Sequence, residues 1–370
     1  MKRLISVILV LIFCSLMTTV TMRVRQEESA APETEAVMLV AERPQLAAEV
    51  FVPKPTPTPE PQYFSISFIG DCTFSSGAYN TGLASSYNNV IGDNYAYPFE
   101  KTVHLLNDDD FTLANLECAL TNHKTAAIKS FVFRAVPEYA KILTEGSVEF
   151  ATLGNNHVED YGQQGYEDTK AALDAEGIAY AGLDEWSLYD ANGLIIGVYA
   201  MSFGNTAQIE AGVRALREAG AELVIAALHW GDEGSYRANG IQVTQGRAAI
   251  DAGADIVYGS HPHVLQPIEE YNGKYIFYSM GNWSFGGNTN PRDKDTAIAR
   301  LEITKDVTGV YVTELKLIPC AISGAGIGNN FQPVPREEDS EEYLRTLSKL
   351  DGSFTGPNLS INYEYSFNEY

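Results

Sequence analysis

Cysteine is scarce in this chain, which has four cysteines among 370 residues. Cys14 lies inside an apolar N-terminal run, and the remaining Cys72, Cys118 and Cys320 cannot all pair with one another. Their spacing also matches no zinc knuckle. We therefore expect a fold that needs no disulfide framework, because a domain of this length buries enough apolar surface without one.

Positive charge is scarce as well, since 25 Lys and Arg stand against 48 Asp and Glu and leave a formal net charge of −23. Binding to a phosphate backbone requires a basic surface, so we expect no nucleic-acid partner. Acidity alone identifies no other partner, because it also serves solubility. An acidic protein that handles an acidic polymer needs local positive charge or a metal ion inside its site.

The N-terminus carries an almost unbroken apolar run from Leu4 to Val20, seventeen residues in all. This length is at the lower limit of a membrane span and exceeds most signal-peptide cores. No small-residue cleavage pair follows at once, which favours an uncleaved signal anchor in residues 1–25 over a cleaved signal peptide. A lipoprotein signal at Cys14 is disfavoured by the bulky Phe13. We predict a single-pass protein of the cell membrane with an extracytoplasmic globular domain.

Residues 26–62 form a linker rich in Glu, Ala and Pro, which ends in the alternating prolines of residues 53–61. Alternating proline favours an extended polyproline spacer. We expect this spacer to hold a globular domain of residues 63–330 away from the membrane. Residues 331–370 are interpreted as a small C-terminal extension.

Short apolar segments alternate with helical segments along the globular region, which is typical of an α/β protein with a buried sheet. Strands are expected near residues 64–69, 111–116, 150–153, 194–201, 223–228, 255–258 and 275–279. Helices are expected near residues 165–177, 207–219 and 245–252.

Polar residues of the types that bind metals follow these strands directly. They are Asp71, Glu117, Asn156, His157, His229, His261 and His263. The chain has six histidines, and four of them belong to this set, which favours a shared site over isolated structural roles. In open α/β sheets such sites form beyond the carboxyl ends of strands. Imidazole, carboxylate and amide ligands suit a divalent transition metal, namely Mn, Zn or Fe, and the set provides ligands for one or two ions.

Seven short motifs in a fixed order resemble those of the capsule-synthesis CapA family. They lie at residues 68–71, 115–117, 133–135, 155–162, 229–233, 259–267 and 278–282. Each motif alone is a weak signal, but the ordered set across residues 63–320 is specific. The resemblance implies a calcineurin-like metallophosphoesterase scaffold, which is a layered sandwich of mixed sheets flanked by helices.

The resemblance also implies residue roles. Glu117 is expected to bridge two metal ions. Asn156, His229 and His261 are expected to complete one metal site, and Asp71 and His263 the other. His157 matches a histidine that is not a ligand and that protonates the leaving group. Arg134 is a candidate clamp for a carboxylate or phosphate, because its guanidinium is planar and bidentate.

Two departures from the scaffold affect the first metal site. Asp71 is followed by Cys72 and Thr73 where the scaffold has Asp-x-His, so one ligand is missing. The scaffold's Gly-Asp-x-x-Asp is replaced by residues 115–117. Cys72 and Cys118 are interpreted as buried packing residues beside the site.

The family resemblance implies a role in the biosynthesis, export or anchoring of an anionic capsule polymer such as poly-γ-glutamate. Two mechanisms stay open: a metal-dependent hydrolase of phosphoester or amide bonds, or a non-catalytic module that binds polymer carboxylates through its metal. The expected partners are the polymer or its precursor, the membrane, and other capsule-synthesis membrane proteins.

Overall fold

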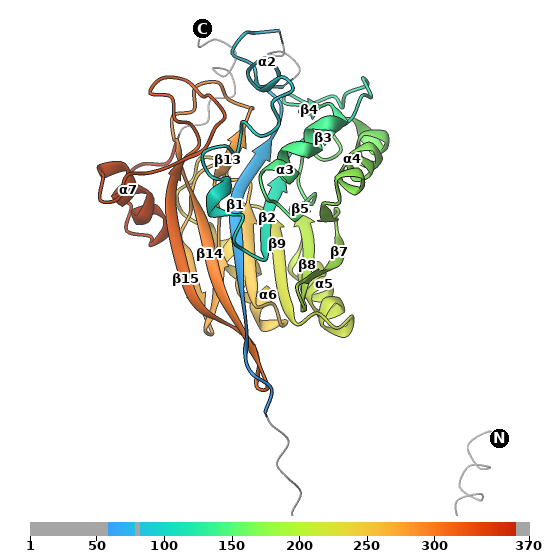
Figure 1. Ribbon diagram of the computed structural model, residues 1–370, viewed down its shortest axis with the longest axis vertical. Coiled ribbons are helices and arrows are strands. Elements are labelled where there is room, and N and C mark those ends of the chain that lie inside the picture. Colours follow the sequence, from blue (N-terminus) through green and yellow to red (C-terminus); the bar gives the residue numbers. More distant parts are fainter. Residues whose placement is uncertain (1–57, 78–81, 360–370) are drawn as a thin grey trace, which may run out of the picture. The chain divides into compact units, whose positions relative to one another are not determined.

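Two β-sheets make the centre of this protein, whose computed structural model describes residues 58–77 and 82–359 (Figure 1). The strands of the first sheet are β1 (Gln62–Thr73), β2 (Phe111–Leu116), β5 (Phe150–Thr152), β6 (Ala179–Ala181), β13 (Asn282–Phe285), β14 (Asp295–Asp306), β15 (Gly309–Ala321) and β16 (Val334–Pro335). Their order is β16-β15-β14-β1-β2-β5-β6, with β13 beside β1.

The second sheet is built from six strands in the middle of the chain. They are β7 (Glu185–Ala191), β8 (Leu194–Ser202), β9 (Leu223–His229), β10 (Ile256–Ser260), β11 (Ile268–Tyr271) and β12 (Lys274–Phe277). Their order is β11-β12-β10-β9-β8-β7. A short separate pair consists of β3 (Ala119–Leu120) and β4 (Arg134–Ala135).

Parallel pairing brings the carboxyl ends of the central strands to one edge of each sheet. In the first sheet β1, β2, β5 and β6 are parallel neighbours. In the second sheet the same holds for β8, β9, β10 and β12. The Tyr258 hydroxyl on β10 donates to the Ile69 carbonyl on β1 at 2.8 Å, so the central strands of both sheets meet near these ends.

The main core lies between the two sheets, because alternate residues of each strand point inward. Phe64, Ile66 and Phe68 of β1 share one buried cluster with Ile225 of β9 and Tyr258 of β10. Strands that are apolar on both faces are expected where helices cover the outer faces.

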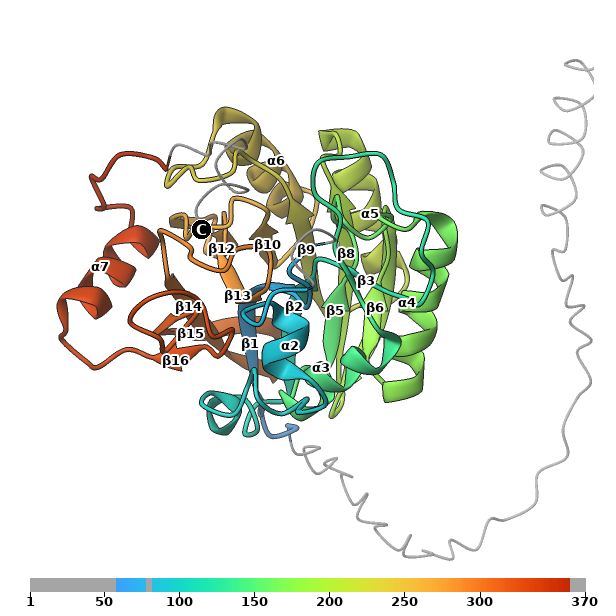
Figure 2. The same cartoon turned by 90° about the horizontal axis from the view of Figure 1, so that it is seen from above.

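Helices cover both outer faces and give four layers (Figure 2). On the first sheet lie α2 (Tyr87–Ile91), α3 (Lys141–Glu145) and α4 (Gly162–Glu176). On the second sheet lie α5 (Thr206–Glu218) and α6 (Gly240–Asp251). A further helix, α7 (Glu341–Leu350), packs against β14 and β15. The structure is a mixed α/β sandwich of sheets flanked by helices, as the sequence predicts.

Two of the outer helices begin at asparagine caps that the helix pattern of the sequence did not include. Asn205 begins α5 and Asn239 begins α6, and each forms a capping box with the glutamine three residues later. The cap satisfies backbone N–H groups that the first helical turn leaves without partners. For this reason α6 begins at Gly240, five residues before the helix expected from residue 245.

The structure describes the predicted C-terminal extension in part, but it does not describe the predicted N-terminal anchor. Residues 1–25 and most of the linker 26–62 lie outside the described residues, so the anchor stays a prediction. Within residues 58–77 and 82–359, no helix combines the length and the apolar character that a membrane span needs. At the other end, β16 and α7 pack onto the sandwich, so residues 334–350 are part of its structure.

Candidate metal centre

The inward faces of the strands change from apolar to polar at their carboxyl ends. On β9 the inward residues Leu223, Ile225 and Ala227 belong to the core, and the next in this alternation is His229. On β10 the same alternation runs from Tyr258 to Ser260. The polar cluster therefore lies at the end of the core between the two sheets. The alternation of side chains along each strand places these polar residues on the inward face.

Glu117 lies at the centre of this cluster, directly after β2. It is buried, and neither carboxylate oxygen has a hydrogen-bond partner. Its oxygens lie 3.5 Å from His229 Nε2 and 3.9 Å from His263 Nδ1. Burial raises the pKa of Glu117 well above its usual value. A buried carboxylate without donors is costly unless it is protonated or faces a cation.

Three groups of potential ligand atoms surround this position, and in each group the atoms lie within 4.8 Å of one another. One group is Glu117, His229 and His261. A second is Asp71, Glu117 and His263. Glu117 therefore belongs to both groups, which is the arrangement that a bridging ligand requires. The third group is Glu233, His261 and His263.

Neighbouring polar atoms orient the imidazoles. His229 Nδ1 lies 2.9 Å from Ser260 Oγ, and its Nε2 lies 2.8 Å from Asn156 Oδ1. His263 Nδ1 lies 3.0 Å from Asn282 Oδ1. His261 Nδ1 is buried and has no hydrogen-bond partner. The Ser260 contact is made by the His229 nitrogen opposite the one that faces Glu117, and a contact of this kind fixes ring orientation in metal sites; a buried imidazole nitrogen without a partner suits a ligand.

Asn115 ties the carboxylate Asp71 to the neighbouring loop. Its Nδ2 donates to Asp71 Oδ1 at 2.9 Å, and its Oδ1 accepts from Thr152 Oγ1 at 3.1 Å and from Asn155 Nδ2 at 3.0 Å. The Asn155 side chain also donates to the Leu116 carbonyl at 2.8 Å. Buried polar groups that are satisfied in this way hold the ligand loops in one arrangement.

The pKa values of the histidines reflect burial and the local excess of negative charge. Burial, reinforced by His261 and His263, holds the pKa of His229 well below its usual range. Burial and the nearby His263 lower the pKa of His261 to about 3. Burial opposes protonation of His263, but Glu117 and Asp71 outweigh it and raise its pKa to about 10. His229 and His261 are thus neutral, as ligands must be, and the protonation of His263 reflects the negative charge that a cation would neutralise.

His157 lies outside the three ligand groups and has a carboxylate partner of its own. Its Nδ1 is 2.8 Å from Asp160 Oδ2, and Asp160 also contacts Lys129 Nζ at 2.5 Å and accepts from the Phe133 N–H at 2.6 Å. Burial lowers the pKa of His157, against the opposing effect of Asp160. Pairing of Nδ1 with Asp160 leaves Nε2 as the nitrogen for proton exchange.

The structure brings six of the predicted residues into direct contact or shared ligand groups: Asp71, Glu117, Asn156, His229, His261 and His263. Arg134 is placed differently, on β4. There its guanidinium donates to the Thr121 carbonyl at 3.3 Å and lies 5.3 Å from the Tyr161 ring centroid. The clamp role of Arg134 stays a prediction.

Glu233, Asn282 and Asp160 were not assigned roles from the sequence, although each lies inside a quoted motif. Glu233 is four residues after His229, and Asn282 follows the strand-end segment 278–281. Their positions after strands were a usable signal for them. Asp160 is three residues after His157, and its role depends on a turn that no periodicity predicts.

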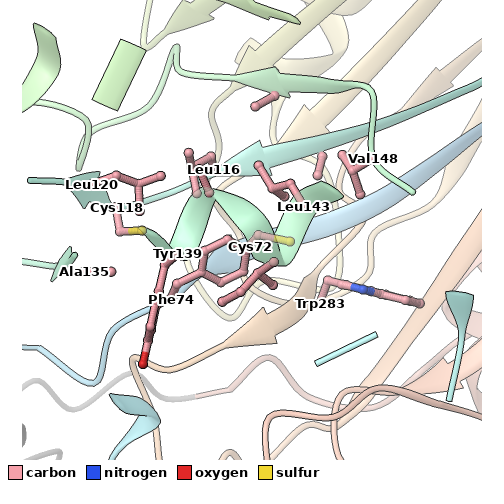
Figure 3. Close-up of a cluster of buried hydrophobic side chains, with 14 of the residues drawn as sticks. Cys72, Phe74, Leu116, Cys118, Leu120, Ala135, Tyr139, Leu143, Val148 and Trp283 are labelled. Atoms are coloured by element: carbon pink, nitrogen blue, oxygen red, sulfur yellow. The ribbon is translucent and has the colours of Figure 1, made fainter. Parts of the chain in front are cut away.

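The interpretation of Cys72 and Cys118 as packing residues is confirmed. Both lie in the apolar cluster on the helical side of the first sheet, beside Leu116, Tyr139 and Leu143 (Figure 3). Burial raises the pKa of Cys118 to about 12 and raises that of Cys72 further. Neither thiol is in the thiolate form that binds metals.

The fold and the site together define a class: an α/β sandwich with a buried histidine–carboxylate cluster of the kind that holds divalent metal, at the carboxyl ends of its strands. The profile of the bacterial capsule synthesis protein family PGA_cap matches residues 65–286, and the chain belongs to this family.

Three relatives are similar over about two thirds of the chain. The PGA biosynthesis protein CapA of Bacillus subtilis is 32% identical, over 69% of this chain and 72% of that protein. The capsule biosynthesis protein CapA of Bacillus anthracis is 28% identical, over 68% and 67%. A probable polyglutamine synthesis accessory protein of Mycobacterium tuberculosis is 27% identical, over 66% and 73%.

Solved structures are similar at a lower level. A structure titled as a novel phosphatase of Mycoplasma pneumoniae is 14% identical with a TM-score of 0.42, covering 70% of this chain and 94% of that one. TT1561 of Thermus thermophilus is 9% identical with a TM-score of 0.40, covering 68% and 99%. Scores of this size assign no activity.

Proposed function

We propose that this protein is a metal-dependent hydrolase outside the cytoplasm, which cleaves a phosphoester or amide bond during the making, export or anchoring of a poly-γ-glutamate capsule. Membership of the capsule synthesis family supports the biological process. The observation that carries the chemistry is Glu117, a buried carboxylate without hydrogen-bond donors, shared by two ligand groups.

The residues present fit one or two divalent transition-metal ions. The donor set combines neutral imidazoles with carboxylates, which suits Mn, Zn or Fe. Glu117 Oε1 and Oε2 and His261 Nδ1 are buried atoms without partners, and a cation would supply one to each. Asn156, His229 and His261 would hold one ion with Glu117, and Asp71 and His263 the other. Bound there, the metal supplies Lewis acidity and a water of lowered pKa.

Side chains of the protein would donate the proton that the leaving group needs. His157 lies beside the ligand groups without joining them, and Asp160 holds its Nδ1 at 2.8 Å. That bond fixes the ring orientation and leaves Nε2 to donate a proton to the leaving oxygen or nitrogen. Burial of the cluster excludes bulk water and strengthens each of these interactions.

The polymer, the membrane and other capsule-synthesis proteins are the partners that we propose. The net charge of −23 would repel an anionic polymer in general. Local attraction would then come from the metal centre and from Lys129 beside His157. A single-pass anchor in residues 1–25 and the proline-rich spacer would keep this site at the outer surface of the cell membrane.

A second candidate is a non-catalytic module that binds polymer carboxylates through its metal. One feature of β1 favours it. Thr73 stands where the family scaffold has the histidine of its Asp-x-His pair, so one imidazole ligand is missing two residues after Asp71. A metal with fewer protein ligands would have more positions open for polymer carboxylates.

Substitution of His157 distinguishes the two candidate functions, because only a hydrolase needs this residue for turnover. The full-length protein would be loaded with Mn²⁺ or Zn²⁺ and tested on phosphoesters and γ-glutamyl peptides. For a hydrolase, we expect His157→Gln to keep the metal and the fold while turnover falls about 10²–10⁴-fold, the range of a positioned proton donor. We expect His229→Ala to lose metal and turnover together. A His157→Gln protein with full metal, normal melting and undiminished turnover would remove the proton-donor role.

A further inference from the structure

Three phenylalanine rings pack against three histidines of the site, and one of these rings is exposed. Phe133 lies 4.6 Å from His157 between ring centroids, and Phe285 lies 4.9 Å from His263. These two phenylalanines are 6% and 7% exposed. The third, Phe203, lies 4.8 Å from His261 between ring centroids, with the two rings nearly perpendicular at 82°, and is 56% exposed.

Phe203 also has an unfavourable backbone conformation. Its φ is 47°, in the left-handed region that a bulky side chain rarely adopts. Glycine or asparagine would adopt it at lower cost. Strain of this kind persists at functional sites when the side chain itself is needed.

The turn that carries Phe203 is held firmly, so the ring has a defined position. The Phe203 N–H donates to the His229 carbonyl at 3.0 Å. The Gly204 carbonyl accepts from Gln245 Nε2 at 2.7 Å, and Asn205 begins α5 with its capping box. The exposed ring therefore stands at a fixed place beside the metal ligand His261.

We infer that Phe203 is a specificity-determining residue that contacts an apolar part of the substrate next to the scissile bond. This inference rests on the proposed hydrolase function. A ring that contacts His261 and keeps more than half of its surface exposed has apolar surface left for a ligand. A ring cannot hydrogen-bond to a carboxylate, so its partner is the methylene or aromatic part of the substrate. The substrate class is therefore an ester or amide that carries such a group beside the anionic centre.

The test compares ligands that differ only in this group. Methylphosphonate and phenylphosphonate would be titrated calorimetrically into the full-length, Mn²⁺-loaded protein. We expect wild type to bind phenylphosphonate roughly two- to tenfold more tightly, the range of one aromatic contact. Phe203→Ala and Phe203→Asn should bring this ratio to about one while methylphosphonate affinity and metal content stay unchanged. The asparagine variant tolerates the left-handed backbone, and Phe203→Tyr should restore the preference.

Trp186→Ala is the matched control. Trp186 is an aromatic residue on β7 that is 44% exposed and lies outside the ligand groups. We expect its removal to leave the phenyl-to-methyl ratio unchanged. An unchanged ratio in both Phe203→Ala and Phe203→Asn, or no phenyl preference in wild type, would overturn the inference. If wild type shows the preference but hydrolyses none of the phosphoesters or γ-glutamyl peptides, the hydrolase proposal fails while the apolar contact stands.

Discussion

At the residue scale, the partly buried Glu149 and the buried Glu117 show how the partners of a carboxylate indicate its role. Glu149 precedes β5, and its Oε2 accepts from the Thr112 N–H at 2.7 Å. Burial raises its pKa to about 7, against this hydrogen bond. Glu117 has no such donor at either oxygen, and histidines surround it instead. The first carboxylate supports the backbone, and the second is placed for a cation.

Glu117→Gln should therefore abolish metal uptake, because it removes the shared ligand of both groups. We expect metal content near zero by elemental analysis after loading and desalting. At a free metal concentration about 100 times Kd, wild type gains about 2.7 kcal/mol of stability from binding, and the variant should gain none. Glu149→Gln is the control and should keep its metal. Equal metal content in wild type and Glu117→Gln would show that Glu117 is not a ligand.

Asp160→Asn should weaken the positioning and basicity of His157 without removing metal. Asp160 raises the pKa of His157, so its neutralisation lowers that pKa further. If His157 donates a proton, the decline of turnover at high pH should then begin at a lower pH. We expect kcat to fall about tenfold or more with KM little changed, measured across a pH series. An unshifted profile would indicate that Asp160 only supports the fold.

The sequence predicted most members of the three potential ligand groups, because strand-end positions follow from the apolar pattern. Phe203 could not be found in this way. It follows β8 like the other site residues, but a phenylalanine after a strand resembles core. Its exposure and its contact with His261, 58 positions later in the numbering (261 − 203), exist only once β8 and β10 lie in one sheet.

At the element scale, α7 is fastened to the sandwich by ion pairs as well as by apolar contacts. Lys349 is almost fully buried and contacts Asp293 and Asp295 at 2.7 Å each. Asp295 also pairs with Arg336 at 2.9 Å and with Arg345 at 2.8 Å. Residues 331–370 were interpreted only as a C-terminal extension, since local sequence cannot reveal partners on β14.

Acid should loosen this attachment. Burial opposes ionisation of Asp295, but Arg345 and Lys349 outweigh it and lower its pKa to about 2. A carboxyl with a folded pKa below its unfolded value of about 3.9 stabilises the protein above that value. The contribution of about 2 kcal/mol should disappear as the pH falls from about 4 to 2. Urea unfolding across this range measures it.

Asp295→Asn should lose this part of the pH dependence and should destabilise the protein at pH 7 by about 3 kcal/mol, because Lys349 stays buried with fewer partners. Glu338→Gln, in the exposed segment before α7, is the control and should change little. An equal loss of unfolding free energy in the two variants would show that the ion pairs of Asp295 with Lys349 and Arg345 do not stabilise the protein specifically.

At the scale of the whole molecule, the alternation of strands and helices predicted an α/β fold with a buried sheet, and the family resemblance supplied the layered sandwich. The interpretation of residues 331–370 as a C-terminal extension did not predict that part of this segment is buried in the sandwich. Phe331 is fully buried in the cluster on the helical side of the first sheet, and α7 follows it. A single apolar residue in a polar stretch carries no periodicity, so its burial was not predictable.

The anchor is the prediction that concerns the molecule in its cell. If residues 4–20 remain in place, the protein should sediment with membranes and be released by detergent but not by high salt. Sequencing of its N-terminus should begin at Met1 or Lys2. A soluble protein that begins within residues 23–50 would contradict the anchor and favour a cleaved signal peptide.

The two sheets jointly contribute the residues of the proposed metal site, so the site can form only after both sheets have come together. Asp71 and His261 are separated by 190 positions and meet only when β1 and β10 are assembled. No partially synthesised or half-folded chain holds a complete set of ligands. Binding of the proposed metal would therefore follow the assembly of the two sheets, and the ions of the compartment in which they assemble would compete for the site.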